Sequence, residues 1–130
     1  MENQLKYYQS KLSFEMDSAD LYLAINKGEN VIAIDARSEE AYQNQHIPTA
    51  LNLPHRIMNE STTKGLDSSI TYVCYCDGIG CNASTKGALK LLELGFKVKE
   101  LIGGIEWWKF DGHATEGLNP TEGEKIKCSC

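Results

Sequence analysis

Hydrophobic residues gather in four short runs that are separated by polar and glycine-containing segments. Residues 31–34 and 70–75 are apolar and rich in strand-forming side chains, which is typical of strands buried on both faces of a parallel sheet. Residues 51–53 predict a shorter strand that ends at Pro54, because proline lacks the N–H that a sheet needs. Residues 96–102 predict the last strand.

Around these strands, apolar residues recur at the three- and four-residue spacing of amphipathic helices. This spacing predicts helices over residues 17–28 and 83–95, each closed by a glycine, and a short peripheral helix over residues 2–12. Ile105 and Trp108 lie one helical turn apart after the last strand. The alternation of strands and helices predicts an α/β class with a mainly parallel sheet, whose ligands bind beyond the carboxyl ends of the strands.

The 130 residues suit one domain, with a core over about residues 13–114 and a polar tail over 115–130 that we expect to be mobile. A net charge of −5 argues against a nucleic-acid partner or an anionic membrane surface, since both favour basic faces. No apolar stretch approaches the length of a membrane span. We therefore expect a soluble, cytoplasmic protein.

The strongest candidate chemistry lies where the strand over residues 70–75 runs into a glycine-rich loop and the next helix. Cys76 ends the strand, so its thiol is expected at the mouth of a loop whose backbone N–H groups point inward. The positive end of the helix would then favour thiolate over thiol. A half-buried cysteine without a role is the alternative. The predicted binding loop comprises Asp77, Gly78, Ile79, Gly80, Asn82, Ala83, Ser84 and Lys86.

The five cysteines form two closely spaced groups, which fits reduced thiols better than a disulfide scaffold. Cys81 is either a resolving thiol for Cys76 or a loop cysteine that points into the core. Cys128 and Cys130 could deliver a thiol to the site, although an incidental exposed pair is favoured. A zinc site is disfavoured because the pairs are spaced C-x-C rather than C-x₂₋₄-C, so we expect no metal.

Three other patterns carry weaker hypotheses. Residues 78–83 match a dinucleotide-binding fingerprint, but only one further strand follows and the domain is small for that cofactor, so none is expected. Asp35 and Arg37 follow a buried strand, and a structural ion pair is favoured over catalysis. His46 is expected to stabilise its own turn rather than to act as a base.

Taken together, three separated motifs resemble the rhodanese-like superfamily. They are the D-x-R…H-I-P segment within residues 34–54, the cysteine loop from residue 75, and the G-G-x-x-x-W ending within residues 101–108. The resemblance implies a single domain with a five-stranded, mainly parallel sheet flanked by helices. It also implies transfer of sulfane sulfur through a cysteine persulfide, which a thiol held by loop amides suits chemically.

The chain departs from the family pattern in its loop, which is two residues longer than usual and holds no arginine. Asp77 is adjacent to Cys76, and the nearest basic residue of the segment is Lys86, one turn into the helix. We therefore expect a dianionic donor such as thiosulfate to be used poorly, and Asp77→Asn to improve its use. The missing arginine also argues against related phosphatases and arsenate reductases, which clamp an oxyanion.

The sequence thus favours a sulfurtransferase that moves sulfur from a small-molecule donor through Cys76 to a thiol, either small or on a protein cysteine. One alternative is a catalytically weak rhodanese-like module for binding or regulation. The other is a redox sensor that uses Cys76 and Cys81.

Overall fold

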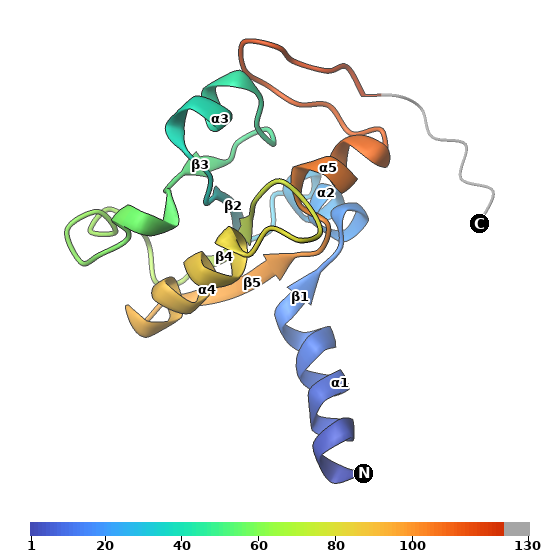
Figure 1. Ribbon diagram of the computed structural model, residues 1–130, viewed down its shortest axis with the longest axis vertical. Coiled ribbons are helices and arrows are strands. Elements are labelled where there is room, and N and C mark those ends of the chain that lie inside the picture. The colour runs from blue at the N-terminus through green and yellow to red at the C-terminus, as the bar shows by residue number, and fades with distance from the viewer. Residues whose placement is uncertain (124–130) are drawn as a thin grey trace.

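The computed structural model describes residues 1–123 and contains one five-stranded parallel sheet flanked by helices (Figure 1). The strands lie in the order β1-β5-β4-β2-β3, and every neighbouring pair is parallel. This confirms the predicted α/β class and sheet. In chain order the elements are α1 (Glu2–Phe14), β1 (Glu15–Met16), α2 (Ser18–Asn26), β2 (Val31–Asp35), α3 (Glu39–Asn44), β3 (Leu51–Asn52), the 3₁₀ turn η1 (His55–Ile57), β4 (Thr71–Tyr75), α4 (Ala83–Glu93), β5 (Lys97–Leu101) and α5 (Gly104–Phe110).

The central strand β4 is buried on both faces, as its sequence predicts. Val73 and Tyr75 point into a core cluster with residues of α2 and α5, whereas Tyr72 and Cys74 point into a second cluster with Leu91 of α4. Side chains alternate between the faces of a strand, so successive residues of β4 pack into the two layers in turn. Cys74 is therefore part of the core and does not share a face with Tyr75.

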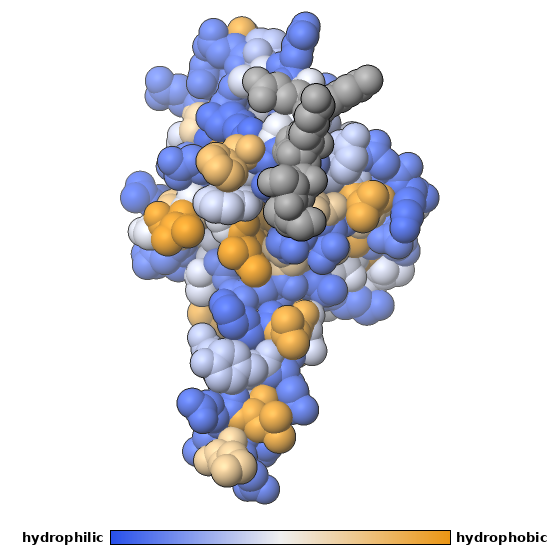
Figure 2. All heavy atoms as spheres, turned by 90° about the vertical axis from the view of Figure 1, so that its right-hand side faces the viewer, coloured by the Kyte–Doolittle hydropathy of each residue, from blue (hydrophilic) through white to orange (hydrophobic). Residues whose placement is uncertain are grey.

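Helix α1 projects from the body of the molecule, and apolar side chains are visible along it (Figures 1 and 2). None of its side chains is buried against the rest of residues 1–123. Leu5, Tyr8 and Leu12, whose spacing predicts the helix, remain 59%, 56% and 83% exposed. The pattern that predicts this helix therefore does not correspond to packing among residues 1–123.

Deletion of residues 1–12 is expected to leave the stability of the domain nearly unchanged. Because α1 buries no side chain, its loss removes little apolar burial, and the free energy of unfolding should change by less than about 1 kcal/mol. Urea denaturation of the full and shortened chains measures the difference. A loss of several kcal/mol would show that α1 supports the fold.

The segment that follows α5 makes backbone contacts with the domain at the start of the predicted polar tail. Glu116 forms an antiparallel bridge with His46, and the backbone N–H of Leu118 donates to the carbonyl of Gln43 at the end of α3. Thr115 is buried at 4% exposure. Residues 116–119 therefore contact the end of α3 and His46 (Figure 1), which the prediction of a tail from residue 115 does not include. Cys128 and Cys130 lie outside the described residues.

Candidate functional site

Cys76 lies directly after β4, at the carboxyl edge of the sheet where parallel α/β proteins bind ligands. Its side chain is almost fully buried, with 2% exposure. The carbonyl of Cys76 accepts a hydrogen bond of 3.0 Å from the N–H of Ile105, and the carbonyl of Asp77 accepts one of 2.9 Å from Glu106. The start of α5 therefore holds the first two peptide units of the loop in place.

The close contact between α5 and the loop explains why glycines stand at the start of α5. Gly104 has φ +60°, and a Cβ there would come within 2.3 Å of the carbonyl oxygen of Cys76. A side chain would push α5 away from the loop, so close approach requires glycine. The Gly-Gly motif that predicts the end of the fold thus also positions the candidate nucleophile.

The Cys76 thiol begins a hydrogen-bonded chain that ends at a carboxylate. Its Sγ lies 3.4 Å from Oγ of Ser84, and the Ser84 hydroxyl donates to Oε2 of Glu100 at 2.8 Å. Thr85 donates to the same oxygen at 2.6 Å. Ser84 is buried in the first turn of α4, and Glu100 lies in β5 beside Cys74 in the parallel register. The chain connects Cys76 to a group that can accept a proton.

Glu100 is a residue of the candidate site that sequence reasoning missed. From the local sequence, Glu100 is predicted only to be a polar residue in a half-exposed strand. A usable signal is its place near the carboxyl end of the strand next to β4, since such ends meet at one edge of the sheet. The register Cys74↔Glu100 becomes known only from the structure.

The two thiols of the loop have opposite shifts. Burial raises the pKa of Cys76 above its usual range, and its hydrogen bond with Cys81 acts in the same direction, while Ser84 opposes both. Burial also opposes ionisation of Cys81, but hydrogen bonds from Cys76, Ala83 and Asp77 outweigh it and lower the pKa of Cys81. The expectation that loop amides and the helix end favour the Cys76 thiolate is therefore reversed.

Two cavities meet at the loop. A small one, of about 150 Å³, is lined by Cys76 and Cys81 together with Ser84, Glu100 and Glu15. A larger one, of about 510 Å³, is lined by Cys81 but not by Cys76, and lies between the loop, α3 and η1. Cys81 is half-buried and lines both cavities, so it does not point into the core.

Arg37 supplies the cation that the loop sequence lacks. Its guanidinium binds Asp35 at 2.8 Å and reaches across to Asp77 at 3.1 Å. Asp77 is therefore paired rather than an unopposed negative charge beside Cys76, and its side chain is 71% exposed. This corrects the electrostatic basis of the expected handicap with thiosulfate. The Asp35–Arg37 ion pair agrees with the structural role favoured for these residues.

Further basic groups surround the larger cavity. His55 and Arg56 line it beside Arg37, and Lys90 donates to the carbonyl of His55 at 2.6 Å. Burial lowers the pKa of His55, and the charges of Lys90 and Lys86 lower it further. Sequence reasoning placed Arg37 and Lys86 near the site but not His55 or Arg56, because the η1 turn reaches the loop through the fold and not through the chain.

The other predicted loop residues differ in what they contribute. Gly78 packs so tightly that a Cβ would meet a carboxylate oxygen of Glu106 at 2.2 Å, and Gly80 takes the left-handed φ of +96°. Ile79 is 85% exposed, and the Asn82 side chain makes no capping hydrogen bond for α4. Ala83 lines the larger cavity. The loop therefore contributes backbone shape more than side-chain contacts.

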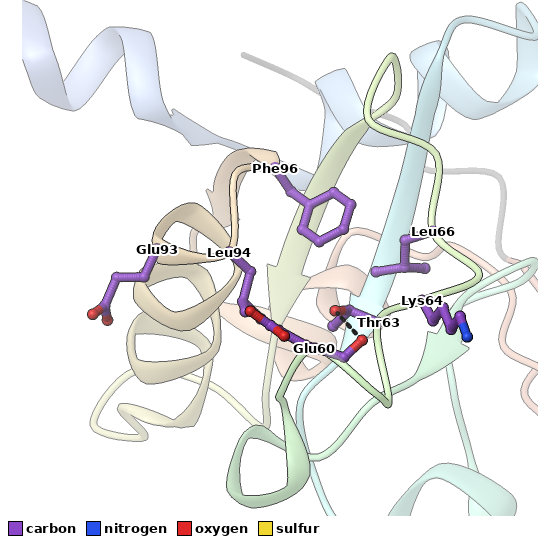
Figure 3. Close-up of a pocket in the computed structure, with 7 residues that line it drawn as sticks. All are labelled: Glu60, Thr63, Lys64, Leu66, Glu93, Leu94 and Phe96. Carbon is purple, nitrogen blue, oxygen red and sulfur yellow. Dashed lines mark hydrogen bonds between the residues drawn. The ribbon is translucent and has the colours of Figure 1, made fainter.

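A further cavity lies away from this site, at the amino ends of β4 and β5 (Figure 3). It measures about 330 Å³, and Leu66, Leu94 and Phe96 line it together with charged residues of the preceding loop and of α4. Figure 3 shows the Phe96 ring pointing toward Leu66 across this space. None of the loop cysteines that the structure describes lines it.

Within residues 1–123, no three His, Cys, Asp or Glu side chains gather closely enough to hold a metal ion. In that same part of the chain, no helix has the length and apolar character that crossing a membrane requires.

His46 forms a hydrogen bond of 2.7 Å between its Nδ1 and the carbonyl of Tyr42, which fits the predicted role in its own turn.

A cysteine at the carboxyl end of a central parallel strand, followed by a loop and a helix N-terminus, defines a thiol-containing α/β domain. The chain belongs to the rhodanese-like domain family, which matches residues 17–111. The thiosulfate sulfurtransferase GlpE of Coxiella burnetii is 36% identical over 95 residues, which is 72% of this chain and 84% of that protein.

Solved structures agree with this family. The BH2092 protein of Bacillus halodurans is 43% identical and superimposes with a TM-score of 0.87 over 98% of this chain and 94% of that one. A Lactobacillus plantarum protein is 26% identical, with a TM-score of 0.70 over 84% of this chain and 92% of that one. The predicted rhodanese-like resemblance is thereby confirmed.

Proposed function

We propose that this protein is a sulfurtransferase in which Cys76 carries the transferred sulfur as a persulfide. The observation that carries the proposal is the position of the Cys76 sulfur, at the carboxyl edge of the sheet, in a small cavity and hydrogen-bonded toward Glu100. The relationship to a thiosulfate sulfurtransferase supports the same reaction class. The substrates are a small-molecule sulfur donor and a thiol acceptor, either small or a protein cysteine.

In the first half-reaction, Cys76 loses its proton and attacks the sulfane sulfur of the donor. The thiol proton passes to Ser84 while the Ser84 hydroxyl proton passes to Glu100, so the two short steps leave no buried charge on serine. A bond forms between Sγ of Cys76 and the sulfane sulfur, and the donor's own sulfur–sulfur bond breaks. With thiosulfate, sulfite leaves with the bonding electron pair.

In the second half-reaction, an acceptor thiolate attacks the outer sulfur of the persulfide. The bond between this sulfur and Sγ of Cys76 breaks, and Cys76 leaves as a thiolate. The Ser84 hydroxyl can then donate to the sulfur, and the backbone N–H of Ser84 also stabilises its charge. The acceptor becomes a persulfide, and Glu100 can return the proton to Cys76.

The larger cavity is the site that we assign to the anionic part of the donor. Its lining includes the guanidinium groups of Arg37 and Arg56, and it adjoins the small cavity at Cys81. His55 and the carboxylates of Glu39 and Asp77 also line it, and Asp77 is paired with Arg37. A guanidinium group suits the oxygens of a sulfonate-like anion because its N–H groups form a planar fork. We therefore expect this site to accept thiosulfate as a donor.

Asp77→Asn is expected to change kcat/KM for thiosulfate by less than about threefold. Asp77 is largely exposed and already paired with Arg37, so removing its charge changes the local field little. Steady-state assays with thiosulfate and with a neutral persulfide donor measure the effect and its specificity. A selective gain of tenfold or more with thiosulfate would restore the view that Asp77 repels the donor.

Glu100→Gln is expected to slow Cys76 at neutral pH and to move its activity to higher pH. The amide cannot take the proton from Ser84, so a thiol whose pKa is already raised ionises only through solvent. Turnover near pH 7 should fall about tenfold or more and recover partly at alkaline pH. The exposed Glu93→Gln on α4 is the matched control. An unchanged pH profile would remove Glu100 from the mechanism.

A non-enzymatic rhodanese-like module is the second candidate, because burial raises rather than lowers the pKa of Cys76. The direct test is turnover of the full chain with thiosulfate and a thiol acceptor, measured as sulfite released per protein. Sustained sulfite production supports the sulfurtransferase. A complete lack of turnover with thiosulfate, polysulfide and persulfide donors would support the module instead.

A further inference from the structure

The structure holds a second thiol in the same cavity as the candidate nucleophile. Sγ of Cys76 donates a hydrogen bond of 3.3 Å to the backbone carbonyl oxygen of Cys81. Both side chains line the same cavity of about 150 Å³. The two sulfurs therefore share one small space at the carboxyl edge of the sheet.

The loop between these cysteines is built to let them approach. Only four residues separate them, two of which are glycines, and the N–H of Cys81 donates to the carbonyl of Gly78 at 3.2 Å to close a turn. Gly80 takes the left-handed φ of +96° with open space around it. A disulfide has a specific geometry, and glycines give the loop the backbone freedom to adopt it.

The two thiols also differ in a way that sets their roles. Cys81 is less buried, and the backbone N–H groups of Ala83 and Asp77 stabilise its thiolate. Cys76 is deeper and connected to Ser84 and Glu100. Thiol–disulfide exchange requires a thiolate that attacks and a sulfur that bears a leaving group. Cys81 suits the first role and a persulfidated Cys76 the second.

We propose that Cys81 resolves the Cys76 persulfide and releases its outer sulfur as hydrosulfide. This inference rests on the proposed sulfurtransferase function. The Cys81 thiolate attacks Sγ of Cys76, and a bond forms between the two cysteine sulfurs. The bond from Sγ to the outer sulfur breaks, and that sulfur leaves with the electron pair. The sulfane sulfur is reduced while the two cysteines are oxidised to a disulfide.

The protein then needs a dithiol reductant to return to its starting state. An external dithiol opens the Cys76–Cys81 disulfide by exchange and is itself oxidised to a disulfide. Without such a reductant, each chain releases at most one sulfide. With it, the protein converts donor sulfur to sulfide, which is an activity distinct from passing sulfur to an acceptor thiol.

A single-turnover experiment tests this inference. The full chain, with Cys128 and Cys130 replaced by serine so that the two thiols outside the described residues are removed, is loaded anaerobically with one equivalent of thiosulfate, whose leaving group is sulfite, so that any sulfide comes from the persulfide. Rapid acid quench and peptide mass spectrometry follow the Cys76 persulfide and the Cys76–Cys81 disulfide, while a sulfide assay follows the released product. We expect the persulfide to appear first and then to give disulfide and sulfide in equal amounts.

Cys81→Ser in the same background is the critical variant, and Cys81→Ala repeats the test without a hydroxyl. In both, the persulfide at Cys76 should accumulate, and sulfide release should be slowed by at least about tenfold. Sulfide release that is equally fast without Cys81, or a wild-type persulfide that persists with no disulfide, would overturn this inference alone. If Cys76 never gains sulfur in any of these proteins, the sulfurtransferase proposal fails with it.

Discussion

Cys76→Ser is expected to reduce sulfur transfer by at least about a thousandfold, because a serine hydroxyl neither ionises readily nor forms a stable persulfide analogue. No other loop cysteine that the structure describes can take its place, because only the Cys76 sulfur is hydrogen-bonded to Ser84. Sulfite release from thiosulfate with an excess of acceptor thiol measures the loss.

Cys74→Ser is the matched control for this experiment. The same atom is changed two residues earlier in β4, but the side chain lies in the core cluster beside α4, where burial raises its pKa to about 12. This variant should lose some stability and retain turnover per folded molecule. If Cys76→Ser kept its turnover, or if both variants lost it equally, Cys76 would not be the nucleophile.

Asp35→Asn is expected to give the largest loss of stability among the polar residues near the site. Asp35 is fully buried and accepts hydrogen bonds from the Arg37 guanidinium, from the Arg37 backbone N–H at 2.9 Å and from the Tyr75 hydroxyl at 2.8 Å. An amide would leave the nearly buried guanidinium without its main partner. Breaking such a pair costs about 3–5 kcal/mol.

Asp77→Asn is the matched control here, because Asp77 binds the same guanidinium from an exposed position. Its loss should cost less than about 1 kcal/mol, as for other solvent-exposed ion pairs. Urea denaturation of the two variants beside the parent chain gives both values. Equal losses, or a loss below about 1 kcal/mol for Asp35→Asn, would contradict a structural role for the buried pair.

Most of the sheet could be predicted from the sequence, because β2 and β4 are buried on both faces and so appear as continuous apolar runs. The edge strand β1 could not be predicted from its own pattern. It has two residues, Glu15 and Met16, and exists through its pairing with Glu100 and Leu101 of β5. Helix α3 likewise has no buried residue, so it lacks an apolar face that a pattern could reveal.

The candidate site could be predicted in part. The position of Cys76 follows from a strand, a loop and a helix that are consecutive in the chain. Arg37 reaches Asp77 across 40 residues, and Glu100 reaches Ser84 across 16, through the parallel order of β2, β4 and β5. The direction of the Cys76 pKa shift also depends on burial, which raises the pKa and outweighs the opposing hydrogen bonds of Ser84.

The measurement that tests the central claim most directly is the location of the first transferred sulfur. The full chain is mixed with thiosulfate, quenched in acid within its first turnover, and mapped by peptide mass spectrometry. The proposed mechanism predicts a gain of one sulfur atom on Cys76 before any change at Cys81, with sulfite released in equal amount. A first gain on Cys81 with Cys76 unmodified, or sulfite release without sulfur on Cys76, would contradict it.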